Sequence, residues 1–208
     1  SGQESYYDPE QGWIDKWAMW GQDEFVLDPT RITLAVGGTG GQVLRDTAQP
    51  GAILTRVAAS HLRVGTFQYA AGRQDKALLE TLVDYTLKRH YPDQLNADNP
   101  ALALLEAVMD RQIALITEWM RVGFIHGVMN TDNVAIAGET IDYGPCAFMD
   151  SYHPDTVFSS IDRQGRYAYS NQGPITHWNL AQFATSMVQI MPDTDRAIED
   201  FTARLNQF

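Results

Sequence analysis

The stretch HGVMNTDNVAIAGETIDYGP, from His126 to Pro145, places two carboxylates and an amide among Val, Ile, Ala and Gly residues. Asp132 and Asn133 read as a loop, and a short strand, a glycine turn and a second strand are predicted to end at Asp142. Turn formation explains each polar residue singly. It does not explain why a hairpin brings a second acid back beside the first loop.

An amide oxygen and a carboxylate that meet in this way suit Mg²⁺ or Mn²⁺, because these cations take few protein ligands and complete their shell with water and phosphate. Asn133 and Asp142 are therefore the candidate metal ligands. Asp132 is then available to accept a proton from an attacking hydroxyl.

Composition limits the class of protein. The 208 residues carry a net charge of −11 and are 44% hydrophobic, which predicts a globular domain with a substantial core. The acidic balance disfavours nucleic acid as a partner. We expect no membrane span and no leader peptide, and the single cysteine, Cys146, fits a reducing, cytoplasmic location.

The order of elements predicts an α+β fold that is mostly helical. Residues 30–47 are expected to form a hairpin around the glycine-rich turn Gly37–Gln42, and residues 51–58 a further strand. Helices are predicted from residue 75 to about 91, from Pro100 to Val122, and over 176–191 and 193–208, with a loop-rich stretch at 150–172.

Local signals define the two central helices further. Asn99 is the expected N-cap and Gly123 the expected stop of the helix that begins at Pro100. Two apolar stripes are predicted to face the core: Leu78, Leu79, Leu82 and Val83 on one helix, and Leu102, Leu105, Met109, Ile113, Ile116 and Met120 on the other.

Protein kinases and aminoglycoside phosphotransferases carry a loop of His, Arg or Gly, and Asp, with an Asn five residues after the Asp and a further Asp on the next ribbon. His126-Gly127, Asn133 and Asp142 match this pattern, whereas Val128 occupies the usual base position. A loop with an acid directly before the Asn, as Asp132 stands here, is similar to that of the selenoprotein O (YdiU) family. Further stretches also resemble this family: PGAILTRVAASHLRVGTFQYAA, TDNVAIAGETIDYGPCAFMDSYHPD, GRYAYSNQ and WNLAQFA.

This resemblance implies a pseudokinase fold and an enzyme that transfers AMP from ATP to Ser, Thr or Tyr hydroxyls of proteins. It implies Asp132 as catalytic base, Asn133 and Asp142 as ligands of Mg²⁺ or Mn²⁺, and Arg56 and Arg63 as contacts of the phosphates of an ATP held in the reverse of the kinase orientation. Arginine is independently favoured where phosphate is gripped. The alternative is that both arginines pair with acids of this acidic chain. His126 is interpreted as a brace for the loop.

The resemblance also divides the chain into an unassigned segment, 1–28, and a kinase-like large lobe with its linking hairpin, 29–208. No counterpart of the family's small lobe, with its glycine-rich loop, lysine and glutamate, is expected before residue 30. The stretch Gly37–Gln42 lacks the Gly-Lys-Ser/Thr ending of a phosphate-binding loop. Two alternatives to the adenylyltransferase stay open: a non-catalytic binding or regulatory remnant, and a small-molecule phosphotransferase, which Val128 disfavours.

Overall fold

The computed structural model describes residues 7–8, 12–13, 33–44, 47–143 and 145–208. The chain forms two compact units, Ser1–Ala59 and Ser60–Phe208. Most of the unassigned segment 1–28 lies outside the described residues, so the boundary at residue 28 stays a prediction. The α+β class with a majority of helix is confirmed.

The described part of the first unit contains antiparallel strand pairs. Strand β1 (Tyr7–Asp8) pairs with β2 (Gly12–Trp13), and β3 (Thr33–Leu44) pairs with β4 (Ala48–Val57). The predicted strand at 51–58 is therefore confirmed.

The predicted turn at Gly37–Gln42 is wrong, because these residues lie inside β3 and face β4 across a register shift between Gly38 and Gln42. Glycines tolerate the irregular backbone of such a bulge. The hydroxyl of Thr39 donates to the backbone oxygen of Gly51 over 3.0 Å and holds the two strands together there. The pairing continues past this stretch to Leu44, which lies opposite Ala48.

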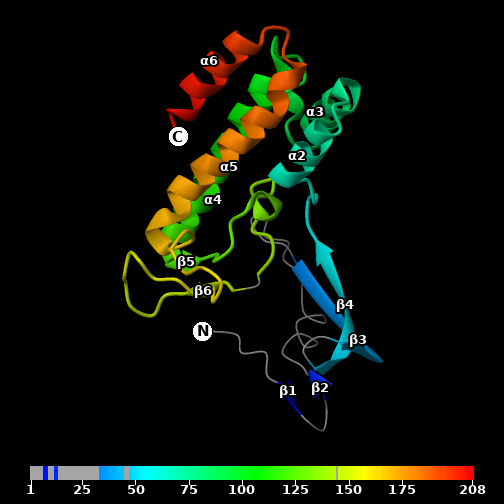
Figure 1. Cartoon of the computed structure of the whole chain (residues 1–208), viewed down its shortest axis with the longest axis vertical. Helices are drawn as coiled ribbons and strands as arrows, with labels where there is room; N and C mark the ends of the chain where they lie inside the picture. Colours follow the sequence, from blue (N-terminus) through cyan, green and yellow to red (C-terminus); the bar gives the residue numbers. More distant parts are fainter. Residues whose placement is uncertain (1–6, 9–11, 14–32, 45–46, 144) are drawn as a thin grey trace. The chain divides into compact units, whose positions relative to one another are not determined.

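The second unit is built from helices (Figure 1). They are α2 (Val64–Gly72), α3 (Lys76–His90), α4 (Pro100–Val122), α5 (Gln172–Met187) and α6 (Thr194–Leu205). Single 3₁₀ turns occur at η1 (Pro92–Gln94), η2 (Thr131–Asn133), η3 (Tyr169–Asn171) and η4 (Val188–Ile190), and β5 (Phe124–Ile125) pairs with β6 (Ala147–Phe148). Helix α2 was not predicted, since it is short and contains two glycines.

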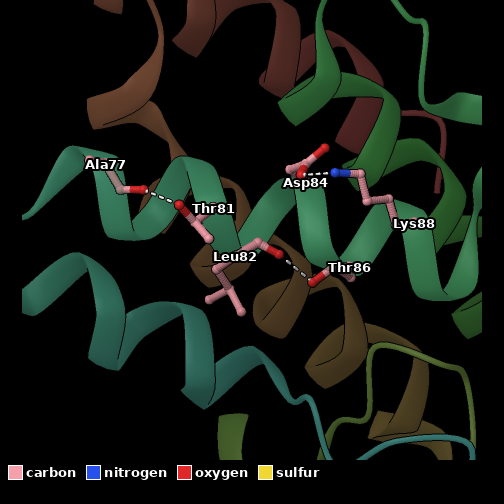
Figure 2. Close-up of polar contacts among 6 residues, drawn as sticks. All are labelled: Ala77, Thr81, Leu82, Asp84, Thr86 and Lys88. Atoms are coloured by element: carbon pink, nitrogen blue, oxygen red, sulfur yellow. Dashed lines mark hydrogen bonds and ion pairs between the residues drawn. The ribbon is translucent and has the colours of Figure 1, made fainter.

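Helix α3 begins where Asp75 accepts a hydrogen bond from the backbone N–H of Leu78 over 3.0 Å. Figure 2 shows the hydroxyls of Thr81 and Thr86 donating to carbonyl oxygens one turn earlier in the helix, and the ion pair between Asp84 and Lys88. The bond made by Thr86 matters because this residue is fully buried and its hydroxyl would otherwise lack a partner. Leu79 and Val83 are buried as predicted, whereas Leu78 is 43% exposed and does not belong to the core face.

Helix α4 has the predicted ends. The side chain of Asn99 accepts from the backbone N–H of Leu102 over 3.1 Å, a cap that contributes about 1 kcal/mol. Gly123 ends the helix with a φ of 72°, a conformation that costs glycine nothing. Ile113 belongs to the predicted apolar stripe but is 37% exposed. The neighbouring Gln112 is buried instead, because its side chain donates to the backbone oxygen of Ala135.

The core of the second unit lies between α2, α3, α4, α5 and α6. Phe67 of α2 meets Phe183 of α5 edge to face, with ring centroids 4.8 Å apart. Both rings are fully buried, so truncation of either to Ala is expected to cost about 3–5 kcal/mol. A smaller cluster around Trp119, Phe124 and Met129 packs beneath the loop that carries the candidate site. Within the described residues, no helix is long and apolar enough to cross a membrane.

Candidate active site

The segment that follows η2 is held by backbone pairing on two sides. Val134 bridges Thr140 in antiparallel register, and Ala135 bridges Arg63. Val64 donates to the oxygen of Val134 over 3.0 Å, and Ile136 donates to the oxygen of Leu62 over 2.9 Å. The ribbon, residues 134–142, was expected to contain two strands and has a single bridge between them. Its residues 134–136 also pair with the residues that lead into α2.

The Val134–Thr140 bridge lies one residue after Asn133 and two residues before Asp142. That the side chains of Asn133 and Asp142 converge stays a prediction. The chain reverses between Val134 and Thr140 through this bridge instead of through regular strands. Any shared ligand of these side chains would lie at this open end of the ribbon.

Asn133 has an amide whose orientation is fixed by the protein. Its Nδ2 donates to the backbone oxygen of Val128 over 2.9 Å, and its backbone N–H donates to the oxygen of Asn130 over 2.9 Å. The amide nitrogen is therefore occupied, and Oδ1 is the atom available to a cation. Asp132, the preceding residue, is exposed.

Asp142 adopts a left-handed backbone, with a φ of 63°. Aspartate tolerates this region better than most residues, but it still carries a cost that folded proteins concentrate at functional sites. The residue is half-buried. Aspartate adopts this conformation in turns as well as at functional sites, so the role of Asp142 as a ligand stays a prediction.

His126 braces the loop, as interpreted from the sequence. The ring is fully buried; its Nδ1 accepts from the N–H of Val128 over 3.3 Å and its Nε2 donates to the oxygen of Ile141 over 2.6 Å. Burial lowers the pKa of this imidazole, in keeping with a neutral ring that donates on one side and accepts on the other. One side chain thus joins the residue two positions after it to the residue just before Asp142.

Gly127 allows the loop to pass close to Pro145. Its φ is 86°, and a Cβ at this position would lie 2.9 Å from Cγ of Pro145. A larger residue would be strained by its backbone and would also push the two segments apart. The His126-Gly127 pair therefore fixes the start of the loop against its end.

Further polar side chains hold the backbone of the loop from below, and the sequence analysis did not identify them. Tyr91 donates to the oxygen of Ile136 over 2.6 Å, Gln112 to that of Ala135 over 2.7 Å and Asn179 to that of Met129 over 2.8 Å. Gln172 donates to the oxygen of Phe124 and accepts from the N–H of His126, and Trp119 donates to the hydroxyl of Thr140. The sequence could have indicated these side chains as polar residues within otherwise apolar stretches, because a buried polar group needs a hydrogen-bond partner.

Arg63 precedes the first turn of α2, where its backbone N–H donates to the hydroxyl of Thr66 over 3.2 Å. Its Nε is buried and has no hydrogen-bond partner in the described part of the chain. No described acid lies within ion-pair distance of its guanidinium. The alternative of a structural ion pair is therefore not seen for Arg63, while its role towards phosphate stays a prediction.

Arg56 lies in β4, opposite Leu34, and belongs to the first unit. Its side chain is outside what the structure describes. The prediction that Arg56 contacts a nucleotide is consequently untested.

The donor set fits the expected cation. In the described residues, no three His, Cys, Asp or Glu side chains gather in a way that could hold a metal ion. Mg²⁺ and Mn²⁺ do not need such a cluster, because one or two protein oxygens together with phosphates and water complete their shell. The amide oxygen of Asn133 and the carboxylate of Asp142 are of the required type.

A pocket of about 830 Å³ lies elsewhere in the second unit, between α3, the start of α4 and α6. It contains none of the candidate site residues. Its polar lining is mainly acidic, with Glu80, Asp84, Asp98, Asp193 and Asp200 against Arg196. This charge is unsuited to the phosphates of a nucleotide, so the pocket does not compete with the ribbon as a nucleotide site.

Comparison with known proteins decides the family. The family described as "Protein adenylyltransferase SelO" matches residues 27–208. The chain belongs to this family.

Relatives from bacteria agree with the assignment to the SelO family. A protein nucleotidyltransferase YdiU of Alcanivorax borkumensis is 67% identical over 180 residues, which cover 86% of this chain and 37% of the relative. A protein of the same name from Shouchella clausii is 61% identical over 167 residues, covering 80% of this chain and 34% of the relative. The chain thus spans little more than a third of the length of these SelO-family relatives.

Proposed function

We propose that this chain carries the base and the metal ligands of a protein adenylyltransferase, which transfers AMP from ATP to Ser, Thr or Tyr hydroxyls of proteins. The observation that supports the proposal is the Val134–Thr140 bridge, which lies between the Asp132–Asn133 turn and Asp142 in a chain of the SelO family. The second unit then corresponds to the large lobe of a kinase-like fold. Since ATP is the donor, we place the reaction in the cytoplasm.

In the proposed reaction, Asp132 accepts the proton of the attacking hydroxyl as its oxygen forms a bond to the α-phosphorus of ATP. The bond between the α-phosphorus and the bridging oxygen breaks, and pyrophosphate leaves with the electron pair. The product is a phosphodiester that joins AMP to the protein.

Asn133 and Asp142 would hold Mg²⁺ or Mn²⁺, which screens the negative charge of the phosphates. Arg63 precedes α2, and its Nε has no hydrogen-bond partner among the described residues. We assign it to the phosphates together with Arg56. A reversed ATP, with the α-phosphate towards Asp132, is what makes AMP instead of phosphate the transferred group.

The test compares ATP labelled at the α-phosphate with ATP labelled at the γ-phosphate, with Mg²⁺ or Mn²⁺ and a mixture of protein substrates. We expect α-label on protein Ser, Thr or Tyr, and none with Asp142→Ala. Asp132→Ala should reduce turnover more than it reduces binding of the cation.

Other results identify the alternatives. Transfer of the γ-label would favour a phosphotransferase. No transfer of either label, together with no rise in the unfolding midpoint on addition of ATP and the cation, would favour the non-catalytic remnant.

A further inference from the structure

Gly65, the second residue of α2, lies directly against the side chain of Asp132 in η2. A methyl group at this position would overlap Oδ1 of Asp132 and would lie 3.1 Å from its Cγ and 3.5 Å from its Cα. All three closest neighbours of that methyl group belong to Asp132. The hydrogen atom of Gly65 is thus the only side chain that leaves the carboxylate where it is.

The two backbones cannot separate to make room. On one side of this contact, Val64 donates to the oxygen of Val134, and Ile136 donates to the oxygen of Leu62. On the other, the backbone of η2 is fixed by the bond from Asn133 to Asn130. Val64, Val134 and Ile136 are all buried, so opening the pairing would leave buried polar groups without partners.

We propose that Gly65 is a positioning residue, which fixes the rotamer of Asp132 and so aims the carboxylate at the attacking hydroxyl. This inference rests on the proposed function, in which Asp132 is the base. In this proposal Gly65 acts through its contact with Asp132. The first turn of α2 adds a favourable environment for the negative charge of that carboxylate.

The role of Gly65 can be separated from a role in folding. Gly65 has an ordinary helical backbone, not a positive φ, so an alanine meets no backbone strain there. Alanine is also the better helix former. The cost of Gly65→Ala therefore falls on the displaced carboxylate of Asp132, while the helix itself gains.

Gly173 supplies a matched control, because it is the second residue of α5 and a methyl group there would meet nothing within 4 Å. We expect Gly173→Ala to raise the urea midpoint of unfolding, and Gly65→Ala to raise it less or to lower it. In the Asp132→Ala background the two nearest atoms are gone, so Gly65→Ala should regain the benefit seen with Gly173→Ala. An equal effect of Gly65→Ala in both backgrounds would show that the contact does not constrain Asp132.

Activity tests the positioning itself. Gly65→Ala should lower kcat by about a hundredfold, as expected when a reacting group moves by about 1 Å, with little change in KM for ATP. Gly173→Ala should keep full activity. In the Asp132→Ala background, Gly65→Ala should cause no further loss, since both changes act on one group.

Three results would overturn the inference: full kcat in Gly65→Ala, a loss that appears only in KM, or an undiminished loss in the Asp132→Ala background. If the unchanged chain transfers no nucleotide at all, the proposed function fails and the positioning role fails with it. The unfolding comparison then still decides whether Gly65 fixes the side chain of Asp132, so the two failures are distinguishable.

Discussion

Nδ2 of Asn133 donates to the backbone oxygen of Val128 over 2.9 Å, so the amide is oriented before any cation binds. Asn133→Ala removes both this bond and the oxygen proposed as a ligand. We expect the affinity for Mn²⁺, measured by calorimetric titration, to fall about tenfold or more. Asn130→Ala, an exposed neighbour in the same loop, is the control. An equal loss of affinity in both variants would contradict the role of Asn133.

Asp142 combines a proposed ligand with a strained backbone, and two substitutions separate these properties. Asp142→Ala and Asp142→Gly both remove the carboxylate, so both should abolish binding of Mn²⁺. Glycine tolerates a φ of 63° without cost, whereas alanine does not. Asp142→Gly should therefore be more stable than Asp142→Ala by about 1–2 kcal/mol in urea unfolding. Retention of Mn²⁺ binding by either variant would remove Asp142 from the site.

Tyr91 supports the site from beneath, and its hydroxyl can be removed without loss of the ring. Tyr91→Phe leaves the buried oxygen of Ile136 without its donor, which should lower the free energy of unfolding by about 1–3 kcal/mol. Burial raises the pKa of this phenol, which keeps it protonated as a donor. Tyr85→Phe, on the exposed side of α3 shortly before Tyr91, should cost little. Similar losses in both variants would show that the bond to Ile136 is unimportant.

The sequence predicts the helices well where local signals are strong. Asn99, Pro100 and Gly123 specify the ends of α4 through capping alone, and these ends are found. Helix α2 carries no such signal, because its position depends on backbone pairing with the distant residues 134–136. The prediction of a turn at Gly37–Gln42 is wrong because glycine permits a bulge within a strand as readily as a turn.

The candidate site shows the same division between local and distant contacts. Asp132, Asn133 and Asp142 are close in the chain, so their type and spacing make them candidates, and their roles stay predictions. Gln112 reaches the loop from α4, and Tyr91 reaches it from just after the end of α3. No local pattern in the sequence predicts these contacts. Helical periodicity alone predicts Ile113 in the core. The buried residue that contacts the loop is its neighbour Gln112.

His126 makes the stability of the fold dependent on pH. Its folded-state pKa is lowered, chiefly by burial, so between that value and the ordinary histidine pKa of about 6.5 the unfolded chain binds the proton that the folded chain does not. The free energy of unfolding must therefore fall as the pH falls below about 6.5. Protonation would also place a proton on Nδ1, where it would face the N–H of Val128 and break that hydrogen bond.

His90 contributes in the same direction, since burial and then the charges of Arg89 and Arg111 lower its pKa. The measurement is urea unfolding in EDTA at a series of pH values between about 5 and 7.5, which span the ordinary histidine pKa. We expect His126→Gln to be less stable than the unchanged chain at pH 7.5 but to lose less stability on acidification. The reason is that glutamine removes the buried imidazole, which binds a proton less readily in the folded chain than in the unfolded chain. His90→Gln should flatten the dependence further when combined with it. If the dependence on pH is as steep in the double variant as in the unchanged chain, neither histidine is its source, and the neutral brace between Val128 and Ile141 is not what acid disrupts.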